Sequence, residues 1–336
     1  MSDLRVGVVG AGLMGADHVV RIQKRTAGAT VSAVIDPDAP RAEAAAQTAA
    51  GSATFPSLTA AIEADSMDAV LIATPGQFHL PDLLVALEAK LPVLCEKPLT
   101  PEPESAIKVI EAEIAGGAKL IQVGFMRRFD PGYMELRDIV AQQLYGDLLA
   151  LRCQHRNPSV PEGYTNEMLI NDSVVHELDV VRYLTDSPVA AVDIRYLKRN
   201  TSNFEHLHEP ILAFLETKSG VVADVEMNVS VKFGYQVKTE AVFENGVVEI
   251  GRTSGTTVWS EGRYSGTEHM TFKTRFKEAF ENELQCWVNA AKNGTIDGPS
   301  AWDGYLVAEA CKAGVQAIQT GKRVEVNYLP KPDFYE

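Results

Sequence analysis

The sequence predicts an α/β fold: a doubly wound parallel sheet at the N-terminus, then an α+β domain with an open, mainly antiparallel sheet. Two patterns lead to this prediction. Short apolar runs alternate with helical stretches through the first third of the chain, which is typical of a parallel sheet covered by helices on both faces. Later segments alternate between apolar and polar residues, as strands do when one face of their sheet is buried.

The length and composition exclude several classes of protein. The 336 residues correspond to about two domains, and 46% hydrophobic with 23% charged residues is typical of a globular chain. A net charge of −14 argues against binding to nucleic acid or to an anionic membrane surface. There is no signal peptide pattern and no apolar run of ~20 residues, so we expect a cytoplasmic protein. The four cysteines are widely separated, and we expect reduced thiols.

The first predicted strand, residues 4–9, is an apolar, β-branched run of the kind that parallel sheets bury. It leads into Gly10-Ala11-Gly12-Leu13-Met14-Gly15, which matches GxGxxG, and a helical stretch at 16–24 follows. The pattern alone is common, but a strand before it and a helix after it are the context that a dinucleotide-binding turn requires. We therefore assign a run of five residues to cofactor binding: Gly10, Ala11, Gly12, Leu13 and Met14.

Each glycine of this turn has a physical reason. Gly10 allows the tight turn, Gly12 lets backbone N–H groups approach a pyrophosphate, and Gly15 lets the helix pack closely on the strand. The N-terminus of the helix then faces the anion, which its dipole favours.

An acidic residue follows at the expected distance. The second predicted strand, residues 30–35, ends in Asp36, at about the 20-residue spacing of an acid that binds an adenosine ribose. Its carboxylate can accept hydrogen bonds from both ribose hydroxyls and repels a 2′-phosphate. The next residues, Pro37 and Asp38, provide no adjacent arginine for such a phosphate. The pattern predicts NAD as the cofactor in preference to NADP.

The alternation of helices and strands continues to about residue 124. Helices are predicted at 41–50, 81–90 and 101–115, and strands at 68–73, 91–95 and 119–123. Ligands of a doubly wound sheet bind at the carboxyl ends of its strands. These ends carry Gly10, Asp36, Thr74, Lys97 and residues 124–127.

The second domain begins with a strand that is apolar on one side. Residues 148–157 alternate, with His155 and Asn157 on the apolar side at the tip of the strand, and Pro158 ends it. His155 is therefore either a satisfied structural histidine or a substrate contact. We favour the substrate contact, because the tip of the strand is where a core meets a cleft.

Residues 171–179 are the most informative segment of this domain. On a helix, Asp172, His176 and Asp179 fall on one face because they are spaced i, i+4 and i+7. Such a stripe can be a solvated helix face, a metal site or an acid–base pair. We favour the acid–base pair and expect no bound metal, because no further ligand lies at close spacing.

An enzyme that oxidises an alcohol with NAD needs a group that accepts the hydroxyl proton. His176 is the natural base near neutral pH, because imidazole has an unperturbed pKa of ~6.5. Asp172 would orient the imidazole or bind a substrate hydroxyl, and the Lys97 ammonium can donate to the reacting oxygen. The sequence leaves open whether His176 or Lys97 takes the proton first.

The rest of the domain is predicted to be mostly sheet. Strands are expected at 210–216, 221–231, 235–243 and 247–251, with a hairpin turn at 244–246. Alternate residues of 221–229 form an apolar stripe, and a broad sheet of this kind often becomes a subunit interface. Helices are expected at 276–292, where apolar residues recur at core-forming spacing, and at 305–319.

Three segments together resemble the Gfo/Idh/MocA oxidoreductases. They are the strand with its GAGLMG turn, Ala73-Thr74-Pro75 followed by His79, and Glu96-Lys97-Pro98. Within that family, the DxxxHxxD helix and segments 124–131, 155–159 and 233–235 resemble the inositol 2-dehydrogenases.

The resemblance implies a fold, a set of site residues and an assembly. It implies a Rossmann domain at 1–124, a substrate-binding and oligomerisation domain at 125–336, and a helix at about 300–320 that packs back on the first domain. It implies a homotetramer formed through the second sheet. Its cofactor segments add Thr74, Pro75, His79, Glu96 and Lys97 to the predicted NAD site. The predicted polyol site consists of Lys97, Arg127, His155, Asn157, Asp172, His176, Asp179 and Tyr235, of which Lys97, Asp172 and His176 are catalytic.

The expected activity is NAD-dependent oxidation of myo-inositol to 2-keto-myo-inositol (scyllo-inosose), with a small neutral polyol as the substrate. Alternatives are a dehydrogenase of scyllo-inositol, D-chiro-inositol or an aldopyranose. Two other classes stay open: a glycosidase that uses NAD for transient oxidation, and a sensor that binds NAD without turnover. The acid–base set formed by Lys97, Asp172 and His176 argues against the sensor, which has no need of it.

Overall fold

The computed structural model describes residues 2–251 and 254–336. The chain divides into two compact units: residues up to 125 with 280–308 and 329–336 form the first, and residues 126–279 with 309–328 form the second. The first unit thus includes two stretches from the C-terminal part of the chain, residues 280–308 and 329–336. The sequence predicted that a single helix at about 300–320 packs on this unit. No helix within the described ranges is long and apolar enough to cross a bilayer.

The first unit is built on six parallel strands in the order β3-β2-β1-β4-β5-β6. The strands are β1 (Leu4–Val9), β2 (Ala29–Ile35), β3 (Ala53–Phe55), β4 (Ala69–Ile72), β5 (Val93–Glu96) and β6 (Ile121–Gly124). The predicted doubly wound sheet is confirmed. The sequence did not predict β3, because three residues are too few to show a periodicity. The strand order reverses between β1 and β4, so the carboxyl ends of these strands mark the ligand-binding edge.

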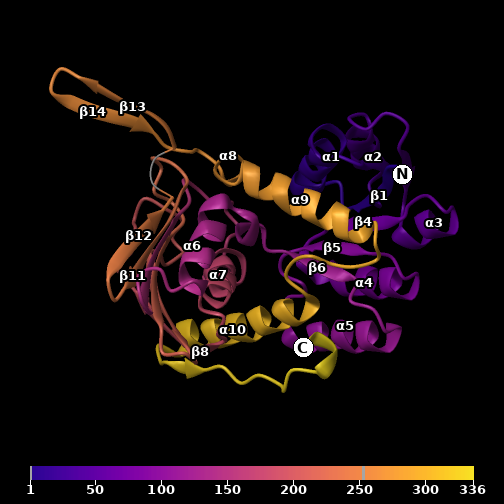
Figure 1. Cartoon of the computed structure of the whole chain (residues 1–336). Helices are drawn as coiled ribbons and strands as arrows, with labels where there is room; N and C mark the ends of the chain where they lie inside the picture. Colours follow the sequence, from indigo (N-terminus) through magenta and orange to yellow (C-terminus); the bar gives the residue numbers. More distant parts are fainter. Residues whose placement is uncertain (1, 252–253) are drawn as a thin grey trace. The chain divides into compact units, whose positions relative to one another are not determined.

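Helices cover both faces of this sheet. Figure 1 shows α1 (Leu13–Arg25) and α2 (Ala39–Ala46) on one face, and α4 (His79–Glu88) and α5 (Pro103–Gly116) on the other. The short helices α3 (Leu58–Glu63) and η1 (Gly76–Phe78) complete the connections. Asp38 caps α2 by accepting a hydrogen bond from the backbone N–H of Arg41, and Ser57 caps α3 in the same way.

The C-terminal part of the chain completes the core of this unit. Leu284, Trp287 and Val288 of α9 (Lys277–Ala291) are buried in one cluster with Val6 of β1 and Val19 of α1, among others. The helical periodicity predicted for 276–292 is therefore confirmed as a core pattern. This shared core explains why residues 280–308 belong to the first unit.

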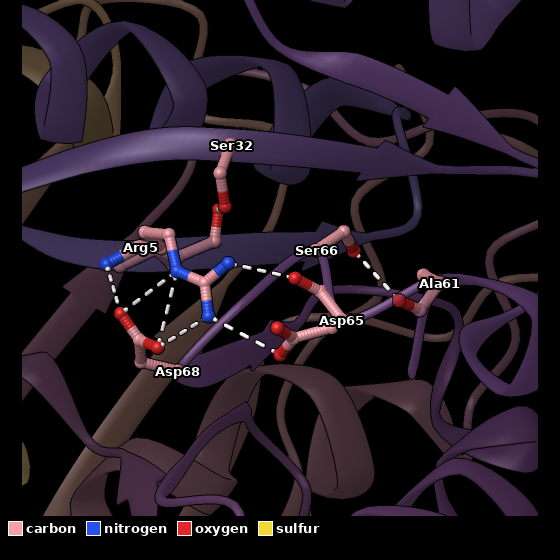
Figure 2. Close-up of polar contacts among 7 residues, drawn as sticks. Arg5, Ser32, Ala61, Asp65, Ser66 and Asp68 are labelled. Carbon is pink, nitrogen blue, oxygen red and sulfur yellow. Dashed lines mark hydrogen bonds and ion pairs between the residues drawn. The ribbon is translucent and has the colours of Figure 1, made fainter. Parts of the chain in front are cut away.

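An arginine organises the amino ends of the strands, at the edge opposite the ligand-binding one. In Figure 2 the guanidinium of Arg5 faces Asp68, which precedes β4, with Nη2 2.7 Å from Oδ1. Nη1 also donates to the backbone carbonyl of Asp65, at 2.7 Å. The hydrogen bonds from Arg5 are the main reason that the pKa of Asp68 lies below its ordinary value. The contact joins β1 to the turn that leads into β4.

The second unit contains a seven-stranded sheet in the order β12-β11-β7-β10-β9-β8-β15. Its strands are β7 (Leu148–Arg156), β8 (Val189–Tyr196), β9 (Ile211–Thr217), β10 (Val222–Asn228), β11 (Gln236–Phe243), β12 (Gly246–Ile250) and β15 (Val324–Glu325). Only β7 and β10 pair in parallel; the other neighbours are antiparallel, so the predicted mainly antiparallel sheet is confirmed.

The helices of the second unit lie against one face of this sheet (Figure 1). They include α6 (Pro131–Ala141), the π-helix η3 (Leu169–Val174), α7 (Val175–Thr185) and the C-terminal part of α10 (Ala301–Thr320). Short helices lie at η2 (Met126–Phe129), α8 (Phe272–Arg275) and, in the first unit, η4 (Asp333–Tyr335). A separate hairpin is formed by β13 (Ser254–Ser260) and β14 (Arg263–Thr267).

The apolar stripe predicted along 221–229 faces the interior of the unit. Its members are all buried: Val221, Ala223, Val225, Met227 and Val229. The alternate residues of β10, such as Glu226, lie on the opposite and partly exposed face, where Glu226 pairs with Arg156 of β7. The homotetramer through this sheet stays a prediction.

We expect Trp287→Ala to lower the free energy of unfolding by about 3–5 kcal/mol, because it empties a fully buried aromatic position in the first core. The matched control is Trp259→Ala on β13, where the tryptophan is 75% exposed and the loss should stay within about 0.5 kcal/mol. Urea denaturation followed by circular dichroism measures both. Equal losses would contradict the core role of Trp287.

Candidate active site

The Gly-rich turn has the geometry that the sequence predicts. Gly10 has a φ of +87°, and a Cβ there would lie 2.8 Å from the backbone nitrogen of Thr74. A Cβ on Gly15 would lie 1.7 Å from the carbonyl oxygen of Gly10, so only glycine allows α1 to approach the turn. A Cβ on Gly12 would meet nothing within 4 Å. The backbone at Gly12 therefore faces open space that a ligand can enter.

The surroundings of this turn fit the phosphates and ribose of a dinucleotide. Gly12 is the N-cap of α1, no side chain caps it, and the first turn contains no acidic residue. An anion is therefore the natural partner of this helix end. Within the described part of the chain, the hydroxyl of Thr74 at the end of β4 is buried without a hydrogen-bond partner. Such a group is available to a bound ligand.

Asp36 is held between the turn and the start of α2. Oδ2 accepts a hydrogen bond from the N–H of Ala11 at 2.8 Å, and Oδ1 accepts one from the N–H of Asp38 at 2.9 Å. The sequence showed no arginine next to Asp36, but the first turn of α2 brings Nη1 of Arg41 within 3.5 Å of Oδ2. The carboxylate is thus oriented by two backbone groups and retains acceptor capacity for a ribose.

His79, predicted to bind the cofactor, bonds to the backbone. Its side chain is buried, with Nε2 2.7 Å from the carbonyl oxygen of Thr74 and Nδ1 2.8 Å from that of Pro98. It therefore connects the loops that follow β4 and β5. Pro75, in the first of these loops, is exposed.

Glu96 and Lys97 lie at the end of β5. Oε1 of Glu96 is 2.7 Å from Nε2 of His18, and Oε2 accepts a hydrogen bond from the N–H of Lys97 at 3.2 Å. Glu96, predicted to bind the cofactor, is thus bound to two groups of its own unit.

In the second unit, three polar residues form one buried cluster. Arg127 and His155 were predicted to bind the substrate, and Glu177 was not predicted. Arg127 is only 1% exposed, and its Nη1 pairs with Oε1 of Glu177. Its Nη2 lies 3.2 Å from Nδ1 of His155, which is also 3.1 Å from Oε2 of Glu177. The guanidinium stands over the ring of Phe276, 5.3 Å from its centroid.

This cluster determines the protonation of its members. Burial alone would raise the pKa of Glu177, but the charges of Arg127 and His155 lower it to about 2. Burial, together with Arg127, lowers the pKa of His155 against the attraction of Glu177. Burial raises the pKa of Tyr235 to about 12, so its hydroxyl stays a hydrogen-bond donor at neutral pH. His155 and Tyr235 touch edge to face, with ring centroids 5.9 Å apart.

His176 lies at the start of α7, beside this cluster. Its ring centroid is 6.3 Å from that of His155. Asp172 lies one turn earlier in the π-helix η3, where Tyr164 places its hydroxyl 2.7 Å from Ser173 and shares a hydrogen bond with Asp172. Wide π turns of this kind occur often at functional sites, because they displace side chains from the regular helical spacing.

Asp179 faces a different partner. Its carboxylate accepts hydrogen bonds from Nε and Nη2 of Arg128, the shortest from Nη2 at 2.6 Å, and is buried. The structure therefore brings Arg127, His155, His176 and Tyr235 together and places Asp179 in a separate ion pair. Since His176 and Asp179 are both buried, they do not form a solvated helix face.

Two further observations concern the predicted substrate contact at Asn157 and metal binding. The side-chain oxygen of Asn157 is buried and has no hydrogen-bond partner in the described structure, so it is available to a substrate hydroxyl. Among residues 2–251 and 254–336, no three His, Cys, Asp or Glu side chains are arranged to hold a metal ion.

Glu177, His18 and Arg41 were not predicted from the sequence. Glu177 directly follows His176, but helical periodicity placed it off the polar stripe. A carboxylate among the valines and leucines of this helix, off its polar stripe, was the available signal, because a buried acid requires a cationic partner. His18 carried no comparable signal, because its partner Glu96 is distant in sequence. Arg41 carried none either, because only the first turn of α2 brings it to Asp36.

Two family models match the chain. The model of the GFO/IDH/MocA oxidoreductase family, with its NAD-binding Rossmann fold, matches residues 4–125, and that of the GFO/IDH/MocA C-terminal domain matches residues 133–249. The chain belongs to the Gfo/Idh/MocA oxidoreductases. The predicted family resemblance is confirmed, and the six-stranded unit is the NAD-binding domain of this oxidoreductase.

Members of the family with known names match along their whole length. An inositol 2-dehydrogenase of Corynebacterium glutamicum is 55% identical over 99% of this chain and 98% of its own. The crystal structure of a myo-inositol dehydrogenase from Lactobacillus casei in complex with NAD(H) and myo-inositol matches with a TM-score of 0.96, at 33% identity over 99% of this chain and 100% of that one. A scyllo-inositol dehydrogenase of the same organism matches with a TM-score of 0.88, at 25% identity over 97% and 98% of the two chains.

We expect Glu177→Gln to lower the free energy of unfolding by about 3 kcal/mol at pH 7, because it leaves Arg127 buried without a counter-charge. The pKa of Glu177 in the folded protein lies below the unfolded value of ~4.3, so its contribution is present above about pH 4.3 and is lost as the pH falls toward 2. Urea denaturation at pH 7 and pH 3 should therefore show a smaller difference between the two proteins at pH 3.

The matched control is Glu240→Gln on β11 of the same unit, where the carboxylate is partly exposed and pairs with Arg152 at 3.5 Å. This pair should contribute less than about 1 kcal/mol. A Glu177→Gln loss that is no larger than the control, or that is the same at both pH values, would contradict the role of the buried ion pair.

Proposed function

We propose that this chain oxidises myo-inositol to 2-keto-myo-inositol (scyllo-inosose) with NAD as the hydride acceptor. The observation that carries the proposal is its full-length similarity to an inositol 2-dehydrogenase at 55% identity. The likeness to a dehydrogenase whose crystal structure holds NAD(H) and myo-inositol supports it. Similarity of fold alone would not support the proposal, because enzymes of one fold act on many different substrates.

The second unit supplies groups that suit a neutral polyol. The unpartnered oxygen of Asn157 accepts a hydrogen bond from a ring hydroxyl, and the protonated Tyr235 donates one. The Nε of Arg127 is likewise buried without a partner in the described residues, although its Nη atoms are bound. Since Glu177 balances the charge of Arg127, the cluster needs no anionic substrate. Asp172, His155 and Asp179 complete the predicted set, with Asp179 holding Arg128 in place.

The first unit supplies the cofactor site. The turn from Gly10 to Met14 would hold the pyrophosphate, Asp36 the adenosine ribose, and Thr74 a further polar group of the cofactor. Bound there, NAD supplies the acceptor for the hydride that leaves the carbinol carbon.

The proton chemistry belongs to side chains of this protein. His176 accepts the hydroxyl proton, and Asp172 orients its imidazole or binds the adjacent hydroxyl. The Lys97 ammonium donates a hydrogen bond to the reacting oxygen and thereby stabilises the negative charge that develops on it.

A second candidate substrate is scyllo-inositol, which the likeness to a scyllo-inositol dehydrogenase favours. The two substrates differ only in the orientation of one hydroxyl, and both give the same ketone. The product therefore does not distinguish them, whereas the relative kcat/KM values do.

We expect the purified protein to form NADH from NAD⁺ fastest with myo-inositol, when tested against scyllo-inositol, D-chiro-inositol and common aldoses. NADH absorbance gives kcat/KM for each. Absence of NADH formation from myo-inositol would overturn the proposal. A higher kcat/KM for scyllo-inositol would favour the second candidate, and hydrolysis of a glycoside without net NADH formation would favour a glycosidase.

We expect His176→Ala to lower kcat/KM by about 10²–10⁴, because it removes the proton acceptor. His208→Ala is the matched control, since His208 lies in a loop where it stacks on Tyr196, and it should change kcat/KM by less than about threefold. Turnover of His176→Ala within about tenfold of the wild type would show that another group takes the proton.

A further inference from the structure

A buried histidine–carboxylate pair joins the helix after the Gly-rich turn to the strand end that carries Lys97. His18 on α1 is 1% exposed, and its Nε2 lies 2.7 Å from Oε1 of Glu96, the last residue of β5. The second oxygen of Glu96 accepts a hydrogen bond from the N–H of Lys97 at 3.2 Å. One carboxylate thus contacts both the cofactor-binding helix and the residue proposed to assist the reaction.

The direction of the hydrogen bond follows from the charges. Burial opposes ionisation of Glu96, but His18 and Lys97 overcome it and lower the pKa of the carboxyl below its ordinary value. Glu96 is therefore an acceptor, and Nε2 of His18 is the donor. The other ring nitrogen, Nδ1, is buried with no hydrogen-bond partner in the described residues. The single contact with Glu96 therefore determines which nitrogen carries the proton.

The space around the pair is arranged for it. Gly124 on β6 leaves room for the carboxylate, because a Cβ there would lie 3.1 Å from Cα and 3.3 Å from Oε2 of Glu96. Phe280 packs edge-on against His18, with ring centroids 5.9 Å apart, and Arg21 stands over the same phenyl ring at 4.8 Å. Charged groups near the pair include Lys97 and Arg21, and Arg21 is itself paired with Asp17 at 2.7 Å.

A purely structural role does not explain this arrangement. Two well-packed apolar side chains would fill the same space without the desolvation of a carboxylate and without an unpartnered ring nitrogen. Buried polar groups that weaken a core are found where they orient reacting groups. Here the carboxylate lies at the ligand-binding edge of the sheet, next to Lys97.

We propose that His18 is a positioning residue of the reaction, which holds Glu96 so that its carboxylate fixes the backbone of Lys97 and stabilises the Lys97 ammonium. The inference rests on the role of Lys97 in the proposed function. It also assigns a second task to α1: its N-terminus faces the cofactor phosphates, and its buried face controls the lysine.

The test compares three variants with the wild type. His18→Met removes the donor, His18→Gln keeps an N–H donor at a similar reach, and Val19→Ala weakens the packing of the same helix without touching the pair. The measurements are kcat, KM, the Kd of NAD, the pH profile of kcat/KM, and acetylation of Lys97 by acetic anhydride without substrate, followed by mass spectrometry.

We expect His18→Met to lower kcat at least about tenfold while the Kd of NAD changes less than about threefold. Without its donor on α1, the Glu96 carboxylate is no longer held at the end of β5, so the alkaline limb of the profile should shift downward by about half a unit or more. Lys97 should be acetylated faster at pH 8. His18→Gln should stay within about threefold of the wild type, and Val19→Ala should lower Tm but leave the alkaline limb in place.

Glu96→Gln provides an independent measurement if His18→Met does not fold, and it should shift the alkaline limb in the same direction. In the double variant His18→Met/Glu96→Gln, the shifts caused by the two single substitutions should not add, because both act through the contact between His18 and Glu96. The inference is overturned if the alkaline limb and the Lys97 acetylation rate are unchanged in both variants, or if Val19→Ala has the same effect.

Lys97→Ala separates the two proposals. Full activity of Lys97→Ala would overturn the role of Lys97 itself. An inactive Lys97→Ala together with a fully active His18→Met would overturn only the inference about His18.

Discussion

The ion pair between Arg127 and Glu177 is the interaction on which the polar interior of the second unit depends. Both side chains are buried, so each requires the other. Their fixed positions orient His155, which contacts both, and His155 in turn packs against Tyr235 and lies beside His176. One charge pair therefore aligns the groups that we assign to the polyol.

The first unit uses buried carboxylates in the same way. Asp36 holds the Gly-rich turn through the N–H of Ala11, and Glu96 holds the Lys97 backbone and His18. Farther from the site, Glu113 accepts hydrogen bonds from the N–H groups of Leu120 and Ile121. A chain with a net charge of −14 thus buries a few of its carboxylates against specific donors, and Asp36 and Glu96 do so at the ligand-binding edge.

Much of the fold was predictable, because its signals are local. Residues 4–9 became β1 with the predicted bounds, and the Gly-rich turn and Asp36 took the predicted positions. The helix that contains His176 was harder to predict. Its periodicity indicated one polar and one apolar face, but α7 is buried on both, and the π turn before it displaces Asp172 from the regular spacing. Asp179, in the regular part of α7, faces Arg128 instead of the cluster around His155.

The fold class, the NAD-binding turn and the residue types of the proposed catalytic set follow from neighbours along the chain, because strand alternation, helix periodicity and turn glycines express short-range sterics and burial. The partners of the buried charges do not. Glu177 pairs with Arg127, Glu96 with His18, and Leu284 and Trp287 join a core built by residues near the N-terminus. Such pairs form only when folding removes water from groups that are distant in sequence, since the energy of a charge or an aromatic ring depends on its surroundings in the folded chain.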